Sequence, residues 1–178
     1  MVFMGNEDFL RRARVLSVDA PELKGDRPAG VLVPVVERDN GFTLLFTVRG
    51  DQLPVHAGQI SFPGGKLRKG ESPQIAALRE TQEETGVTAQ FVKPLGFLDL
   101  RVTSTGFVIA PLVAVLRPGF VLQPCPDEVA EIFEAPLDFF MDPANHLRRG
   151  SWEMPWQGRN IWGATAGILR NMWERLYD

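Results

Sequence analysis

The chain has 178 residues, of which 44% are hydrophobic and 23% charged, and its formal net charge is −3 at pH 7. This length and composition favour a single globular domain over residues 1–178. The negative charge argues against a broad nucleic-acid-binding surface, and the longest apolar runs, such as APLVAVL, are far too short to span a membrane.

The first 70 residues predict a helix, a hairpin and a long loop. Residues 6–16 favour a short amphipathic helix, residues 23–30 a loop, and residues 30–38 a strand. The DNG sequence at 39–41 is a strong tight-turn signal, so residues 42–50 are expected to return as the hairpin partner. Residues 51–70 are rich in glycine and proline, which indicates a loop with short extended pieces.

A well-delimited helix is expected over residues 73–85. Ser72 is a favoured N-cap, Pro73 suits the first helical position, and Gly86 suits the position just after the last turn.

The rest of the chain predicts further strands and a second long helix. Strands are expected at 90–103 and 105–117, with a possible one at 120–123, and residues 126–142 predict a loop followed by a strand or short helix. Residues 160–178 predict a terminal helix, because Ile161, Thr165, Ile168 and Met172 recur at helical spacing. The single cysteine, Cys125, excludes an internal disulfide and fits a reducing, cytoplasmic setting. The result is a mixed α/β domain.

The central helix carries a cluster of acids. At about 100° per residue, Glu84 lies about 40° from Glu80 on one side and Glu83 about 60° on the other. Ile75 and Leu78 fall on the opposite side, which predicts that they form the buried face of the helix. Arg79 can pair with Glu83 four residues later, whereas Glu80 and Glu84 are expected to have no basic partner on the helix.

Clustered carboxylates repel one another, so something must offset the repulsion. A hard divalent cation such as Mg²⁺ binds through a few carboxylates and takes further ligands from water and substrate phosphates. A solvated acidic face is the alternative. The glycines at 64–65, in a loop that leads into the helix, favour the ligand-binding interpretation because they allow a ligand to approach the backbone.

The spacing of these residues resembles the Nudix box, G-x5-E-x7-R-E-U-x-E-E-x-G-U. Its fixed letters match at Gly65, Glu71, Arg79, Glu80, Glu83, Glu84 and Gly86. Thr81 departs from the pattern, since a bulky aliphatic residue is usual at that position. The resemblance implies a Nudix-type α/β/α sandwich with a mixed sheet, and metal-dependent hydrolysis of a diphosphate linked to another group.

Carried over by position, the resemblance assigns roles to residues of the box. Glu80 and Glu84 resemble metal ligands for Mg²⁺ or Mn²⁺, and Glu83 resembles a third acid that assists the metal or the attacking water. Arg79 resembles the residue that orients Glu83. The late acid Glu128 resembles a further catalytic glutamate, so Glu83 and Glu128 both remain candidates for the general base.

The segment LFTVRGDQLPVHAGQISFPGG at 45–65 resembles a second signature, found in the coenzyme A pyrophosphatase branch of that family. Pro54 replaces the arginine of that signature, which removes a basic group from the segment. Candidate substrate-binding residues are Arg49, His56, Gln59, Gly64 and Gly65. The resemblance implies cleavage of coenzyme A or a derivative to 3′,5′-ADP and 4′-phosphopantetheine.

Two alternatives remain open. The substrate could be another nucleoside diphosphate derivative such as ADP-ribose, or the chain could be a Nudix-fold nucleotide-binding module without catalytic activity. The sequence does not indicate an oligomeric state.

Overall fold

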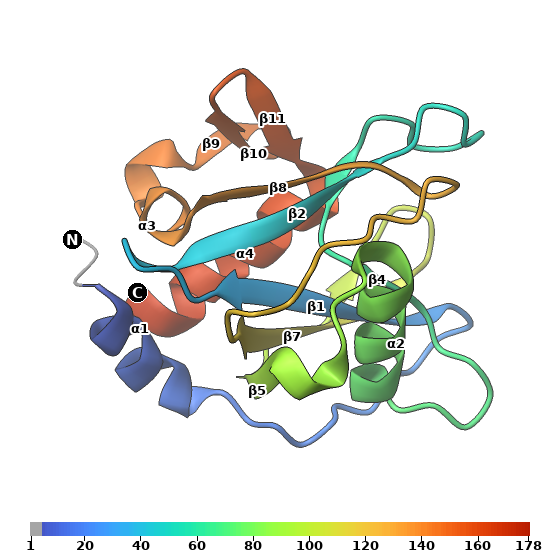
Figure 1. Ribbon diagram of the computed structural model, residues 1–178, viewed down its shortest axis with the longest axis horizontal. Coiled ribbons are helices and arrows are strands. Elements are labelled where there is room, and N and C mark those ends of the chain that lie inside the picture. Colours follow the sequence, from blue (N-terminus) through green and yellow to red (C-terminus); the bar gives the residue numbers. More distant parts are fainter. Residues whose placement is uncertain (1–4) are drawn as a thin grey trace.

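The computed structural model describes residues 5–178 as a mixed β-sheet between helices, together with a small second sheet (Figure 1). The helices are α1 (Asn6–Arg12), α2 (Pro73–Thr85), α3 (Leu137–Phe140) and α4 (Gly163–Tyr177), with short 3-10 turns at Ala13–Val15, Ala89–Phe91 and Pro143–Asn145. The large sheet contains β1 (Pro28–Val36), β2 (Thr43–Arg49), β3 (Ile60–Ser61), β4 (Gly64–Lys66), β5 (Val92–Phe97), β6 (Arg101–Val102), β7 (Val108–Leu116) and β8 (Val129–Pro136). The small sheet contains β9 (Leu147–Arg149), β10 (Ser151–Trp156) and β11 (Arg159–Trp162).

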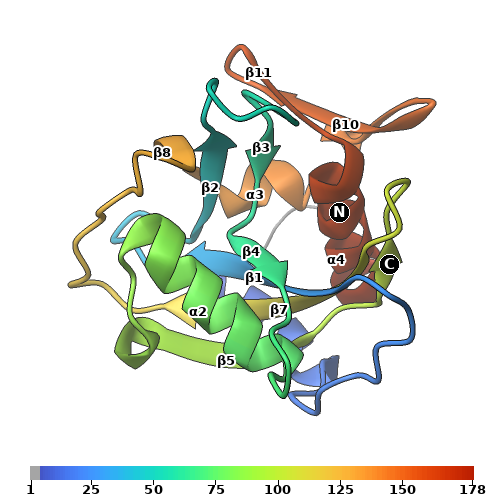
Figure 2. The same ribbon diagram turned by 90° about the vertical axis from the view of Figure 1, so that its right-hand side faces the viewer.

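The large sheet is mixed because β1 and β7 run parallel while the other pairs are antiparallel. Its path runs β3-β2-β1-β7-β5, with β4 also paired to β1, β6 to β7, and β8 to β2. Helix α2 covers one face, and α4 packs on the other side (Figures 1 and 2). This arrangement is the α/β/α sandwich that the sequence predicts.

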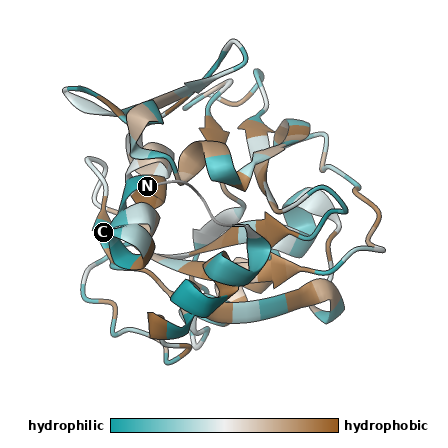
Figure 3. Cartoon of the chain, turned by 90° about the vertical axis from the view of Figure 1, so that its left-hand side faces the viewer, coloured by the Kyte–Doolittle hydropathy of each residue, from teal (hydrophilic) through white to brown (hydrophobic). Residues whose placement is uncertain are grey.

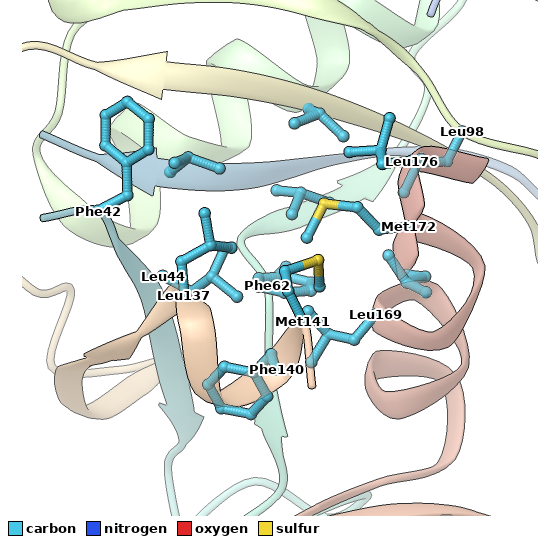
Figure 4. Packing of buried hydrophobic residues seen from close by; sticks show 14 of the residues in the cluster. Phe42, Leu44, Phe62, Leu98, Leu137, Phe140, Met141, Leu169, Met172 and Leu176 are labelled. Atoms are coloured by element: carbon cyan, nitrogen blue, oxygen red, sulfur yellow. The ribbon is translucent and has the colours of Figure 1, made fainter. Parts of the chain in front are cut away.

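Two apolar clusters fill the spaces on the two sides of the sheet. The larger one joins side chains from β1 and β2 to α3 and α4, and Figure 4 shows Leu44, Phe140, Leu169 and Met172 within it. The smaller one lies on the α2 side and includes Leu32, Leu45, Ala77 and Leu112. In Figure 3 the sheet strands are largely hydrophobic, whereas polar colour is concentrated on helices and loops.

Most of the predicted elements are present, but three predictions are wrong. Residues 120–123 form no strand, because they have no neighbouring strand to pair with and Val121 is 73% exposed. The terminal helix begins at Gly163 rather than at 160, since residues 159–162 pair with β10. The strand predicted at 90–103 is interrupted, and its last part, β6, forms a separate pairing with β7.

Candidate active site

Helix α2 begins and ends where the sequence predicts. The Ser72 hydroxyl accepts a hydrogen bond from the backbone N–H of Ile75 at 3.2 Å, and Gly86 adopts the left-handed conformation with φ 81°. These local signals fix the position of the helix in the chain, and with it the register of every acid that it carries.

The face that α2 buries differs from the predicted one. Ile75 is 55% exposed, whereas Ala76, Ala77 and Thr81 are fully buried. The helix lies so close to β1 that a Cβ at Gly30 would come within 2.1 Å of the Pro73 carbonyl oxygen. Small residues therefore hold α2 against the sheet. The prediction that Ile75 lies on the buried face is wrong, whereas Leu78 is partly buried and packs against the apolar cluster on the α2 side.

This close packing also explains the threonine at the aliphatic position of the motif. The Thr81 hydroxyl donates a hydrogen bond to the Ala77 carbonyl at 2.7 Å, so its polar group is satisfied in the buried layer. Its small size suits the close approach of the helix to the sheet.

The two glycines of β4 bring the backbone against the acids of α2. Gly65 pairs with Gly30 across the sheet, and a Cβ at Gly65 would lie 2.5 Å from Oε1 of Glu80. The backbone N–H of Gly64 points toward Oε1 of Glu84 at 3.5 Å. Any side chain at position 65 would have to displace the Glu80 carboxylate.

Arg79 connects the loop before α2 to the acids on the helix. Its guanidinium donates to both carboxylate oxygens of Glu71, at 2.7 and 3.0 Å, to Glu80 at 2.8 Å and to Glu83 at 3.2 Å. The hydrogen bonds from Arg79 lower the pKa of Glu71 to about 2. The expectation that Glu80 has no basic partner is therefore wrong, because Arg79 reaches its immediate neighbour as well as Glu83.

Three carboxylates from two parts of the chain converge. Oxygen atoms of Glu80, Glu84 and Glu128 all lie within 4.8 Å of one another. Glu128 is placed by the loop after residue 123, in which the Cys125 N–H donates to the Glu84 carbonyl at 3.1 Å. Glu83 is not part of this group, since it is 45% exposed and pairs with Arg68 and Arg79.

Burial, together with repulsion among these acids, raises the pKa of two of them. Burial, followed by repulsion from Glu80, raises the pKa of Glu84 to about 8, while Arg49 opposes this change. Burial also raises the pKa of Glu80. An all-oxygen, anionic donor set fits Mg²⁺ or Mn²⁺, and a bound cation would remove the cost of ionising these groups.

Arg49 lies beside the carboxylates. It lines, with Glu84, Glu128, Thr47 and Ser61, a small pocket of about 80 Å³. Its Nε donates to the Val55 carbonyl at 2.7 Å. The structure thus brings together Arg49, Gly64 and the acid cluster.

His56 and Gln59 line a different and wider groove of about 500 Å³. The groove lies where residues 101–107 meet the start of α4, and it also includes Phe107 and Trp162. Sequence reasoning did not assign Arg101 or Phe107 to a site, because only the fold brings their loop to the start of α4. Strand β4 lies between α2 and the α4 side of the molecule (Figure 2).

Comparison with known proteins identifies the family of this chain. A model of the NUDIX domain matches residues 26–154. The chain belongs to the Nudix family. A protein from Citrobacter koseri named uncharacterized Nudix hydrolase NudL is 37% identical over 180 residues, which cover 93% of this chain and 92% of that protein. The protein of the same name from Klebsiella pneumoniae strain 342 is 36% identical over 177 residues, which cover 93% of this chain and 92% of that protein.

Solved structures confirm the Nudix fold. The MutT protein from Methanosarcina mazei Go1 superposes with a TM-score of 0.55 at 18% identity, covering 88% of this chain and 96% of that one. The NUDIX domain of Shewanella oneidensis NrtR, solved with ADP ribose, gives a TM-score of 0.56 at 18% identity, covering 86% of this chain and 90% of that one. This chain is a Nudix pyrophosphohydrolase, an enzyme class that requires a divalent cation.

Within residues 5–178, no helix is long and apolar enough to span a membrane.

Proposed function

We propose that this Nudix hydrolase cleaves the diphosphate of coenzyme A or one of its derivatives, giving 3′,5′-ADP and 4′-phosphopantetheine or its acyl form. The observation that carries the proposal is the position of the segment 45–65. This segment places Arg49 beside Glu84 and Glu128, and it continues through His56 and Gln59 into the wide groove. One continuous stretch of chain thus serves both a diphosphate site and a space for a large attached group.

Glu80, Glu84 and Glu128 are the residues that would hold Mg²⁺ or Mn²⁺. The bound cation supplies neutralisation of phosphate oxygens and a lower pKa for a coordinated water. Arg49 is placed to hydrogen-bond a phosphate oxygen, because its guanidinium lines the same pocket as two of the acids. Arg79 keeps Glu80 and Glu83 in place through direct hydrogen bonds.

The general base is a glutamate that takes a proton from the attacking water. Glu128 lines the pocket, whereas Glu83 is not among its lining residues, is 45% exposed and pairs with two arginines. This geometry favours Glu128 for contact with substrate or metal. Glu83 remains the competing candidate, because it lies on the same turn of α2 as Glu80 and Glu84 and its carboxylate accepts a hydrogen bond from Arg79 at 3.2 Å.

A substrate panel tests the proposal. Coenzyme A, ADP-ribose, NADH and dinucleoside polyphosphates are each incubated with the protein and Mg²⁺ or Mn²⁺, and the products are separated by ion-exchange chromatography. The highest kcat/KM is expected for coenzyme A or an acyl derivative, with 3′,5′-ADP released. Turnover of ADP-ribose without turnover of any coenzyme A form would replace this substrate, and no turnover of any compound would favour a binding module.

The departure at Pro54 gives a second test. Pro54 is exposed on the loop between Arg49 and His56, so an arginine there has room to meet a substrate phosphate. Pro54→Arg is expected to lower the KM for coenzyme A, and Pro54→Ala controls for the loss of the rigid proline ring. Equal changes in the two variants would show an effect of loop flexibility only.

A further inference from the structure

Arg101 is a cation that lacks an anionic partner. It opens the short strand β6 and lines the wide groove together with His56, Gln59 and Trp162. Among residues 5–178, no hydrogen bond, ion pair or aromatic ring contact involves its guanidinium. Burial lowers the pKa of Arg101, and no acid compensates for that burial.

Arg101 also lines a smaller pocket, and the two acids in that pocket, Asp99 and Glu174, are already paired with other groups. Asp99 binds Arg175 and Asn171, and Glu174 binds Arg170 at 2.7 Å. Because both acids are occupied by other side chains, the positive charge of Arg101 is not neutralised by a neighbouring residue. A partly buried guanidinium without an acceptor is an unfavourable arrangement unless a ligand supplies one.

Helix α4 has a glycine where Arg101 packs against it. A Cβ at Gly167 would lie 2.0 Å from the Arg101 Cζ, so the absence of a side chain gives the guanidinium its place against the helix backbone. Glycine in a helix interior costs about 1 kcal/mol relative to alanine. The guanidinium is thereby held against the helix rather than in solvent, and Arg101 lines both this smaller pocket, to which Gly167 belongs, and the wide groove.

The sheet connects this position with the carboxylate site. Arg101 pairs with Ile109, Ile109 with Ala29, and Ala29 with Lys66, the residue after Gly65. Three strand spacings of about 4.8 Å place the Cα atoms of Arg101 and Lys66 roughly 14 Å apart. Residues aligned across a sheet point to the same face, so Arg101 and Lys66 lie on one face, whereas Gly65 beside Lys66 meets Glu80 on the other. The distance suits a nucleotide that passes the edge of β4, with one phosphate on the face of Arg101 and its diphosphate on the face of the carboxylates.

We propose that Arg101 binds the 3′-phosphate of a nucleotide whose diphosphate lies at the carboxylate cluster, and this proposal rests on the proposed function. The exposed indole of Trp162, 47% accessible at the groove, offers the adenine a stacking surface. A fixed guanidinium matches the geometry of a phosphomonoester by donating two parallel hydrogen bonds. The groove therefore distinguishes nucleotides that carry the extra phosphate from those that lack it.

The decisive measurement compares the binding of 3′,5′-ADP and 5′-ADP by calorimetry in metal-free buffer. The parent protein is expected to bind 3′,5′-ADP roughly tenfold or more tightly than 5′-ADP. Arg101→Gln should weaken 3′,5′-ADP binding by roughly ten- to a hundredfold, the effect of one lost charged hydrogen bond, and leave 5′-ADP within about twofold. Arg101→Lys should retain part of the preference. Equal affinities in the parent, or equal losses for both nucleotides in Arg101→Gln, would overturn the proposal.

Two further variants control for charge and folding. Arg117→Gln removes the same charge just after the far end of β7, about 25 Å away along the strand direction, and should change neither affinity. Gly167→Ala keeps the charge but forces the guanidinium from its position, while alanine favours the helix. This variant should lose part of the preference without loss of thermal stability, and an unchanged preference would contradict the assignment.

Measuring the hydrolysis of coenzyme A and dephospho-coenzyme A tests the role of Arg101 separately from the proposed function. The kcat/KM for coenzyme A should exceed that for dephospho-coenzyme A in the parent, and Arg101→Gln should remove the difference. Hydrolysis of both compounds at equal rates in parent and variant would refute the role of Arg101 and keep the proposed function. If neither compound is hydrolysed while ADP-ribose is, the proposed function fails, and with it the assignment of Arg101 to a coenzyme A phosphate.

Discussion

Replacement of Glu84 by glutamine tests the carboxylate site through stability as well as activity. In the metal-free protein, burial and repulsion from Glu80 raise the pKa of Glu84 from 4.5 to about 8. Between these two pH values the folded state binds a proton that the unfolded state has released. The free energy of unfolding therefore falls as pH rises through this range.

The size of the effect follows from the same values. At about 1.4 kcal/mol per pKa unit, the gap between 4.5 and about 8 sets an upper limit of about 5 kcal/mol on the stability lost. The amide of Glu84→Gln is neutral at every pH and nearly the same shape, so its stability should not fall in this way. We expect the variant to match the parent near pH 5 and to be more stable by about 2–4 kcal/mol at pH 9.

Urea unfolding followed by tryptophan fluorescence, in EDTA from pH 5 to pH 9, measures this difference. Excess Mg²⁺ at pH 8.5 should restore stability to the parent and do little for Glu84→Gln, because the cation binds the ionised carboxylate. The variant should also lose roughly 100-fold in kcat, the scale for a group that positions or activates the attacking water.

Glu83→Gln is the matched control on the same helix. It removes an exposed charge that pairs with Arg68 and Arg79, so a small loss of stability is expected at all pH values. If Glu84→Gln followed the parent across the whole pH range, the carboxylate would not be buried beside Glu80. Turnover as fast as the parent at saturating Mg²⁺ would show that Glu84 is not a metal ligand.

Three other predictions concern the site and the core. Gly65→Ala places a methyl group 2.5 Å from the Glu80 carboxylate, so the Mg²⁺ concentration for half-maximal activity should rise tenfold or more while the unfolding midpoint changes little. An unchanged requirement would mean that Glu80 does not hold the cation. In pH–rate profiles of Glu83→Gln and Glu128→Gln, the variant that lacks the general base should lose the ascending limb, and two unaltered profiles would move this role to another group. Burial lowers the pKa of His146 below 6.5, so the parent should lose stability as pH falls through 6.5 and His146→Gln should not; equal losses in urea midpoint at pH 5 would refute the role of the histidine.

Local signals were sufficient for the elements that depend only on neighbouring residues. The N-cap Ser72 and the glycine at 86 fix α2, and the DNG turn fixes the β1–β2 hairpin. The strand predicted at 120–123 failed because an apolar run forms a strand only where another strand is available for pairing. The helix was predicted to start at 160 because Ile161 continues the helical spacing, yet that residue is buried as part of β11, where it pairs with Met154.

Only the part of the site that depends on neighbouring residues in the chain could be predicted from the sequence. Residues of the box lie within one loop and one helix, so their spacing alone places Glu80, Glu84 and Arg79 together. Glu128 approaches from a loop more than 40 positions later in the chain, and no periodicity connects it with α2. The unpaired state of Arg101 is even less visible in a sequence, since it depends on which acids the other arginines occupy.

The misassigned face of α2 shows how packing and chemistry depend on each other in this protein. A helix turned so that it buried Ile75 would leave its acids in water, where their repulsion costs only tenths of a kcal/mol. Small residues at 30, 76 and 77 instead bring the helix backbone against β1, so that Glu84 lies between helix and sheet and its pKa rises. The repulsion is therefore strong because the helix packs closely, and the same closeness leaves a cation as the group that can relieve it. Larger side chains at these positions would add apolar contacts, yet they would also separate helix from sheet and expose the acids. The small residues thus shape the active site, although none of them lines the pocket beside Glu84 and Glu128.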